Sequence, residues 1–222
     1  MGNWLISAVL RTLFHPAPTI QLTDEERRLF DQLYEVGCMR SDRTIQYDLS
    51  IPKYKFLAHI AETRGIIYHG SNNTAIDQFE PRRQTLFNNK LVTAVFGTTD
   101  PIWPIFYAVF RRAALIGSFR NGAVAAGVGG KVYHFYSLTK ATKLNDPWTN
   151  GMVYLLPPNP FKLSESNAGF SFNEWTSELP VEPIAKLPVE PDDFPFLDKV
   201  GSHPASESLG RTWLLYKIRL WR

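Results

Sequence analysis

The 222-residue chain contains a single cysteine, Cys38, which excludes an internal disulfide and a cysteine-based zinc site within one chain. This scarcity is consistent with a reducing compartment, and we expect the protein to be cytoplasmic. Long hydrophobic runs are also missing. The longest, residues 4–10 and 101–110, are far shorter than the ~20 residues of a membrane-spanning helix. The sequence therefore predicts no membrane span.

Common catalytic and metal-binding signatures are absent as well. None of the five histidines is spaced as a metal ligand, and there is no HExxH motif. Residues 127–131 (GVGGK) have the glycines and lysine of a phosphate-binding loop but lack the following Ser or Thr. A GxSxG nucleophile motif is not found. We expect no metal cofactor.

The net charge of +3 hides an uneven distribution. Residues 1–80 and 144–222 are slightly acidic, with net charges of −2 and −3. Residues 81–143 carry nine basic side chains against one acidic side chain, Asp100. Such a segment indicates an anionic partner, whether a diphosphate cofactor, a nucleic acid or a phospholipid head group. An ordinary basic face balanced by acidic neighbours explains it equally well.

The first part of the chain has helical patterns. Residues 1–18 predict a short amphipathic helix that docks on the body of the protein or on another subunit. Thr23 followed by Glu26 predicts the capped start of a second helix, which Gly37 would end. Residues 54–63 predict a third helix. We therefore expect a helical extension over residues 1–62.

The pattern changes at residue 65 to short strands separated by turns. One helix is expected at residues 101–112, beginning late or bending at Pro104, and residues 121–130 predict a loose loop. The expected strands are 66–69, 92–98, 131–137, 152–156, 175–179, 184–189 and 213–220, the last with a helix as its alternative. This order predicts an α+β fold in which the helical extension precedes one domain over residues 63–222.

The stretch most informative about function is a predicted strand that ends in His69 and Gly70. Gly70 has no Cβ, so a ligand can approach its backbone closely. A histidine there can bind a ribose hydroxyl while the glycine N–H and C=O pair with a planar amide. Farther along, Phe96 and Tyr107 provide aromatic faces on which a ring can stack.

These residues resemble the ADP-ribosyltransferase superfamily, whose members include bacterial toxins, poly(ADP-ribose) polymerases and rifampin ADP-ribosyltransferase. His69 and Gly70 match the strand-ending His-Gly of the polymerase-like branch, and Phe96 with Tyr107 matches its pair of aromatics. The branch usually has Tyr at the position of Phe96 and a small residue at that of Pro104. The resemblance implies a mixed two-sheet core and a nicotinamide ring held between the two aromatics.

The third motif of the superfamily is a glutamate that opens a late strand. Glu174, in the sequence Asn-Glu-Trp, matches it best, with Glu178 second and Glu165 third. The resemblance implies that this carboxylate orients the nicotinamide ribose and stabilises the oxocarbenium-like state.

The resemblance also implies contacts to the rest of NAD. A basic residue some thirteen positions after the histidine, here Arg82 or its neighbour Arg83, would bind the diphosphate. Ser71 and the two asparagines that follow it would touch ribose.

By this resemblance the protein is an NAD-dependent mono-ADP-ribosyltransferase or an NAD glycohydrolase, with NAD as co-substrate. The acceptor stays open among protein, nucleic acid, small molecule and water. One alternative is a non-catalytic module that binds NAD, another nucleotide or nucleic acid through residues 81–143. Another is the tRNA 2′-phosphotransferase branch, although Tyr68 rather than an arginine precedes His69.

Overall fold

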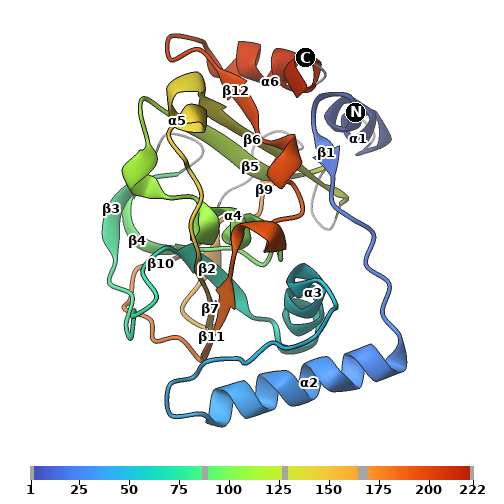
Figure 1. Ribbon diagram of the computed structural model, residues 1–222, viewed down its shortest axis with the longest axis vertical. Coiled ribbons are helices and arrows are strands. Elements are labelled where there is room, and N and C mark those ends of the chain that lie inside the picture. The colour runs from blue at the N-terminus through green and yellow to red at the C-terminus, as the bar shows by residue number, and fades with distance from the viewer. Residues whose placement is uncertain (1–2, 87–89, 127–129, 165–169, 221–222) are drawn as a thin grey trace.

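The computed structural model describes residues 3–86, 90–126, 130–164 and 170–220, and they form an α+β fold (Figure 1). The helices are α1 (Asn3–Leu13), α2 (Asp24–Met39), α3 (Lys53–Arg64), α4 (Trp103–Val109), α5 (Lys140–Leu144) and α6 (Leu209–Leu220). The strands are β1 (His15–Pro16), β2 (Ile67–Ser71), β3 (Arg82–Thr85), β4 (Leu91–Gly97), β5 (Phe119–Ala126), β6 (Val132–Thr139), β7 (Gly151–Leu156), β8 (Lys162–Leu163), β9 (Phe170–Phe172), β10 (Trp175–Ser177), β11 (Ala185–Val189) and β12 (Gly201–His203).

The described strands form three sheets. The first has the order β1-β6-β5-β9, with β12 parallel to β6, and the other two have the orders β3-β4-β10-β8 and β11-β7-β2. A bridge between Tyr68 and Thr98 connects β2 to β4 through two backbone hydrogen bonds of 2.7 and 3.0 Å. The edge strand β2 of the third sheet therefore joins the second sheet at the end of β4.

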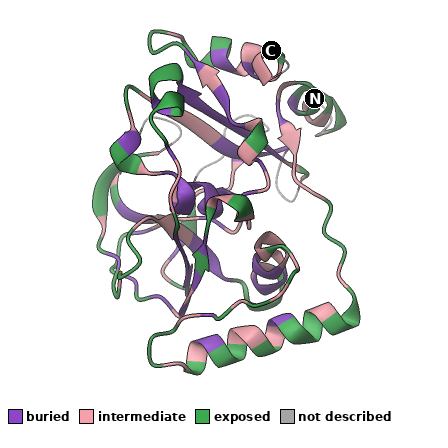
Figure 2. Cartoon of the chain, viewed as in Figure 1, coloured by how far each residue is buried: buried purple, intermediate pink, exposed green. Residues whose placement is uncertain are grey.

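Helix α4 lies in the centre of the molecule, packed on the backbones of β2 and β7 (Figure 2). A Cβ added at Gly70 would lie 1.8 Å from the carbonyl oxygen of Pro104, and one at Gly151 would lie 1.9 Å from that of Ala108. Both glycines are therefore needed for the helix to approach the sheet. Phe106, on the other side of α4, packs on aromatic side chains that include Tyr136 and Phe194.

The start of α4 is fixed by Asp100, the one acidic residue of the basic segment. Its Oδ1 accepts hydrogen bonds from the backbone N–H groups of Ile102 and Trp103, at 2.9 and 2.7 Å. The helix accordingly begins after Pro101, and Pro104 falls in its first turn, where no intrahelical N–H is required. The expected late start of this helix is confirmed.

The N-terminal helices pack at two ends of the molecule. Helix α1 lies near α6, whereas α2 lies at the opposite end beside α3 (Figure 1). The capping box of α2 is formed as expected: the Glu26 N–H donates to Thr23 Oγ1, and the Thr23 N–H donates to Glu26 Oε2. Helix α3 contributes Phe56, Leu57 and Ile60 to the core that contains α4. No helix among the described residues is long and apolar enough to cross a bilayer.

Three local predictions were wrong. Residues 121–126, expected in a loop, belong to buried strand β5, where a Cβ at Gly122 would lie 2.9 Å from the Phe135 ring; the small side chains leave room for aromatics. For residues 213–220 the favoured strand was wrong and the alternative, a helix, is confirmed: they continue helix α6, which buries Thr212 and Tyr216 one turn apart. Helix α2 passes Gly37, which packs against Ile45, and ends at Met39.

Buried His203 should make the fold sensitive to acid. Its Nδ1 and Nε2 lie 2.8 and 3.0 Å from the hydroxyl oxygens of Ser137 and Ser118. Burial, and then the charge of Arg120, lower its pKa from 6.5 to about 4. Because the folded protein binds this proton less readily than the unfolded chain, stability is retained above pH 6.5 and declines as the pH falls toward 4.

We therefore expect the free energy of unfolding to fall between pH 7 and pH 4.5, and to fall less steeply in His203→Gln. Urea unfolding at several pH values measures both slopes. Equal slopes in the two proteins would show that His203 does not contribute to the acid sensitivity.

Candidate functional site

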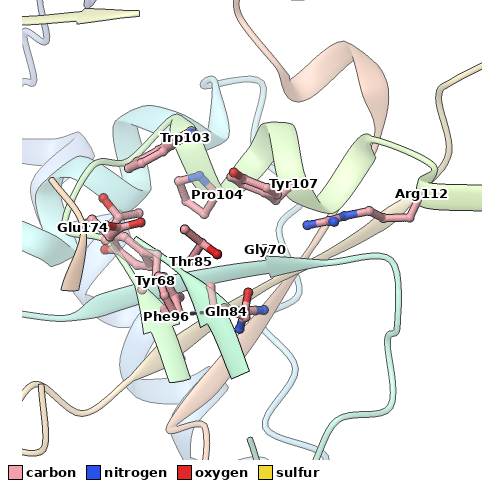
Figure 3. A pocket seen from close by; sticks show the side chains of 13 residues that line it. Tyr68, Gly70, Gln84, Thr85, Phe96, Trp103, Pro104, Tyr107, Arg112 and Glu174 are labelled. Atoms are coloured by element: carbon pink, nitrogen blue, oxygen red, sulfur yellow. Dashed lines mark hydrogen bonds between the residues drawn. The ribbon is translucent and has the colours of Figure 1, made fainter. Parts of the chain in front are cut away.

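A cavity of about 180 Å³ lies beside the bridge between β2 and β4, under α4 (Figure 3). Its walls come from β2, β3, β4, α4, the turn after α4 and the residue before β10. The residues that line it are Tyr68, His69, Gly70, Gln84, Thr85, Phe96, Gly97, Thr98, Trp103, Pro104, Tyr107, Arg112 and Glu174.

An open strand edge forms one side of this pocket. The N–H and C=O groups of a strand residue point to the same side, and successive residues alternate between the two sides. Those of Tyr68 are bonded to Thr98 of the β4 segment. Those of Gly70, two residues on, therefore point toward β4 as well and away from β7. Gly70 thus presents one backbone donor and one acceptor to the pocket, the pair that a planar carboxamide requires.

His69 is held as a neutral imidazole. Its Nδ1–H donates to the carbonyl oxygen of Phe96 at 2.7 Å, and its ring packs on Phe79 with the centroids 4.6 Å apart. Burial lowers its pKa, and the charges of Arg112 and Arg82 lower it further against the opposing effect of the Phe96 hydrogen bond. Because Nδ1 carries the proton, Nε2 is left as an acceptor for a hydroxyl group.

Two aromatic residues lie on facing elements of the pocket: Phe96 on β4 and Tyr107 on α4 (Figure 3). The Tyr107 ring lies 6.2 Å from that of Trp103, whose Nε1–H donates to Asn121 Oδ1 at 2.6 Å. Burial raises the pKa of Tyr107, against a hydrogen bond from Asn121 and the charge of Arg112. The Tyr107 phenol therefore stays protonated at neutral pH, and its ring packs against that of Trp103.

Glu174 is placed in the pocket wall by the start of β10. The next two residues, Trp175 and Thr176, pair with Gly97 and Phe96 of β4. The preceding residue, Asn173, is anchored: its Oδ1 accepts bonds from the N–H and Oγ1 of Thr99 and from the Trp175 indole. Glu174 is half-buried between these fixed neighbours. Its carboxylate lies at the end of the pocket opposite Arg112 (Figure 3).

The structure therefore brings together His69 and Gly70 of β2, Phe96 of β4, Tyr107 of α4 and Glu174, which directly precedes β10. Pro104, the position at which the chain departs from the resembled branch, also lines the pocket.

Other sequence candidates lie outside the pocket lining. Ser71 accepts a hydrogen bond from the Asn73 N–H at 3.1 Å. Arg82 and Arg83 are exposed on β3, and Glu178 is exposed beyond β10. Glu165 and residues 127–129 of the glycine-rich stretch lie outside the described residues.

Sequence reasoning missed Arg112, Trp103, Gln84, Thr85 and Thr98 as pocket residues. Arg112 had a signal, since it belongs to the basic segment and follows Tyr107 by five residues. The other four have no local signal, because their place depends on how β3 and α4 pack.

Comparison of the chain with family models, curated proteins and solved structures found no match. Among the described residues, no group of three His, Cys, Asp or Glu side chains is arranged to hold a metal ion.

Proposed function

We propose that the protein binds NAD in this pocket and cleaves its nicotinamide–ribose bond, transferring ADP-ribose to an acceptor or to water. The observation that carries the proposal is the meeting of a carboxylate, Glu174, with an open strand edge at Gly70 and the rings of Phe96 and Tyr107. Each feature alone is common. Together they fit a flat aromatic amide attached to a ribose, which is the reacting end of NAD.

In this proposal the nicotinamide carboxamide pairs with the N–H and C=O of Gly70. The ring stacks against Tyr107 and Phe96, and the attached ribose places a hydroxyl on Nε2 of His69. All these groups belong to β2, β4 and α4, and both β4 and α4 pack on β2. The ligand would therefore be oriented without a large rearrangement of the protein.

The bond between ribose C1′ and the pyridinium nitrogen then breaks. Its electron pair goes to the nitrogen, neutral nicotinamide leaves, and positive charge develops on the ribose. The Glu174 carboxylate stabilises that charge in a site partly shielded from water. A nucleophile forms the new bond to C1′ and releases its proton to solvent. Glu174 is the one carboxylate among the described lining residues, and Arg112 at the other end of the pocket is positively charged. The stabilisation of the ribose charge is therefore assigned to Glu174.

The proposal is tested by mixing the purified protein with NAD and following nicotinamide release. A matched pair of variants tests the stacking position: Phe96→Ala removes the ring, whereas Phe96→Tyr restores the residue usual in the resembled branch. We expect Phe96→Ala to raise the KM for NAD by about 2- to 12-fold, the range of an aromatic pair, and Phe96→Tyr to leave it unchanged or lower it. Wild-type protein that binds NAD without releasing nicotinamide would overturn the enzymatic proposal.

A second candidate is a non-catalytic module that binds NAD or a nucleotide in the same pocket. The position of Pro104 favours it, because a proline cannot supply the hydrogen bond that the small residue of the branch offers to the amide. The tRNA 2′-phosphotransferase alternative has less support, since Arg112 is the one arginine among the described lining residues and that branch uses a set of arginines. Binding of NAD without turnover would select the non-catalytic module.

A further inference from the structure

Arg112 lies at the mouth of the pocket, in the short turn η1 (Arg112–Ala114) that follows α4. The Arg112 backbone N–H donates to Asn72 Oδ1 at 3.3 Å, and Asn72 Nδ2 donates to the carbonyl oxygen of Ala108 at 2.5 Å. Asn72 directly follows strand β2. One side chain thus ties the end of α4 and the backbone of Arg112 to the strand that carries His69 and Gly70.

The Arg112 guanidinium lies over the aromatic rings of Phe119 and Tyr107. Its guanidinium carbon lies 4.8 Å from the centroid of Phe119 and 5.7 Å from that of Tyr107. Stacking covers a flat face of the guanidinium and leaves its N–H edge free to donate to a planar or tetrahedral anion. No carboxylate among the described residues lies within ion-pair distance of it. Arg111, by contrast, turns toward Asp146.

The pocket consequently has opposite charges at its two ends, with Glu174 at one end, Arg112 at the other and Tyr107 between them (Figure 3). Burial dominates the pKa shifts of His69 and Tyr107; beyond it, the charge of Arg112 lowers both pKa values, while that of Glu174 raises the pKa of Tyr107. The positive charge of Arg112 therefore acts on side chains inside the pocket.

We infer that Arg112 binds the phosphate groups of the ligand, so that a dinucleotide lies with its carboxamide on Gly70, its nicotinamide ribose beside Glu174 and its diphosphate against Arg112. This inference rests on the proposed function, which it deepens by assigning the direction of the ligand. It assigns the diphosphate to Arg112 in place of Arg82, the residue implied by the resemblance, because Arg82 does not line the pocket.

The test is calorimetric titration with two halves of the ligand: nicotinamide, which lacks phosphate, and ADP-ribose, which lacks nicotinamide. Arg112→Gln removes the charge, and Arg83→Gln is the matched control, since Arg83 is exposed on β3 outside the pocket lining. We expect Arg112→Gln to weaken ADP-ribose binding by about 10- to 100-fold, as for other hydrogen bonds to charged groups. Nicotinamide binding should change less than about twofold, and Arg112→Lys should be intermediate.

The outcomes separate this inference from the proposed function. If wild type binds nicotinamide and releases it from NAD, but Arg112→Gln weakens ADP-ribose no more than Arg83→Gln does, the assignment of Arg112 is overturned and the function stands. Equal loss of both ligands in Arg112→Gln also overturns it. If ADP-ribose binding depends on Arg112 while nicotinamide neither binds nor is released from NAD, the function fails and the anion site stands. Binding of neither ligand overturns both.

Discussion

Replacing Glu174 by Gln should lower nicotinamide release from NAD by about 100-fold or more, the usual cost of removing one electrostatic stabiliser of a transition state. The amide keeps the size of the carboxylate and its capacity to hydrogen-bond, but not its charge. Binding of NAD should therefore stay within about threefold, because the charge acts chiefly on the positive charge that develops as the bond breaks. Rapid-quench or continuous assays of nicotinamide release, with binding measured separately, give the two quantities.

Glu178→Gln is the control for this variant. It makes the same chemical change four residues farther along, at an exposed position outside the pocket lining. Its rate of release should match wild type. A similar loss of rate in both variants would show that general acidity of the region matters rather than the placement of Glu174. A loss of rate in Glu178→Gln alone would show that Glu178, and not Glu174, is the catalytic carboxylate.

Gly70→Ala is expected to cost about 3 kcal/mol or more of the free energy of unfolding, at the upper end of the range for overpacking. The added methyl would lie 1.8 Å from the Pro104 carbonyl oxygen and 2.9 Å from the Ala108 nitrogen, both of which are backbone atoms of α4. Backbone cannot rotate aside as a side chain can, so α4 must move away from β2. That movement would also displace Tyr107 and Arg112 from the pocket.

Gly210→Ala is the matched control, since a Cβ there meets nothing within 4 Å and the residue is exposed in the first turn of α6. It should change the free energy of unfolding by no more than about 1 kcal/mol, and in the stabilising direction. Thermal and urea unfolding of the three proteins compare them. A Gly70→Ala protein as stable as wild type would contradict the close packing of α4 on β2.

Gly70 illustrates how far sequence reasoning reached. Its lack of a Cβ indicates room for a ligand near its backbone, and that backbone does face the pocket beside β4. The structure adds a second reason that no local pattern contains: the space beside its Cα is taken by α4. Helix α4 and strand β2 are separated in the sequence, and so are the paired strands β4 and β10. Their meeting depends on tertiary packing.

The capped start of α2 and strands β2, β4 and β10 could be predicted because their signals are local, whereas strand β3, which also lines the pocket, was not predicted. Thr23 and Glu26 specify a capping box by themselves. Strand β5 could not be predicted, since its small residues resemble a loop and are explained by the aromatic side chains across the sheet, such as Phe135. Arg112 was likewise hidden, because the end of α4 decides which of two adjacent arginines enters the pocket.

The most direct test of the proposed site is a crystal structure of the Glu174→Gln protein with NAD, which this variant should bind without cleaving. We expect the carboxamide to accept from the Gly70 N–H and donate to its C=O, the pyridinium ring to lie between Phe96 and Tyr107, and the diphosphate to contact Arg112. NAD bound elsewhere on the protein, or with its adenine end in this pocket, would contradict the account.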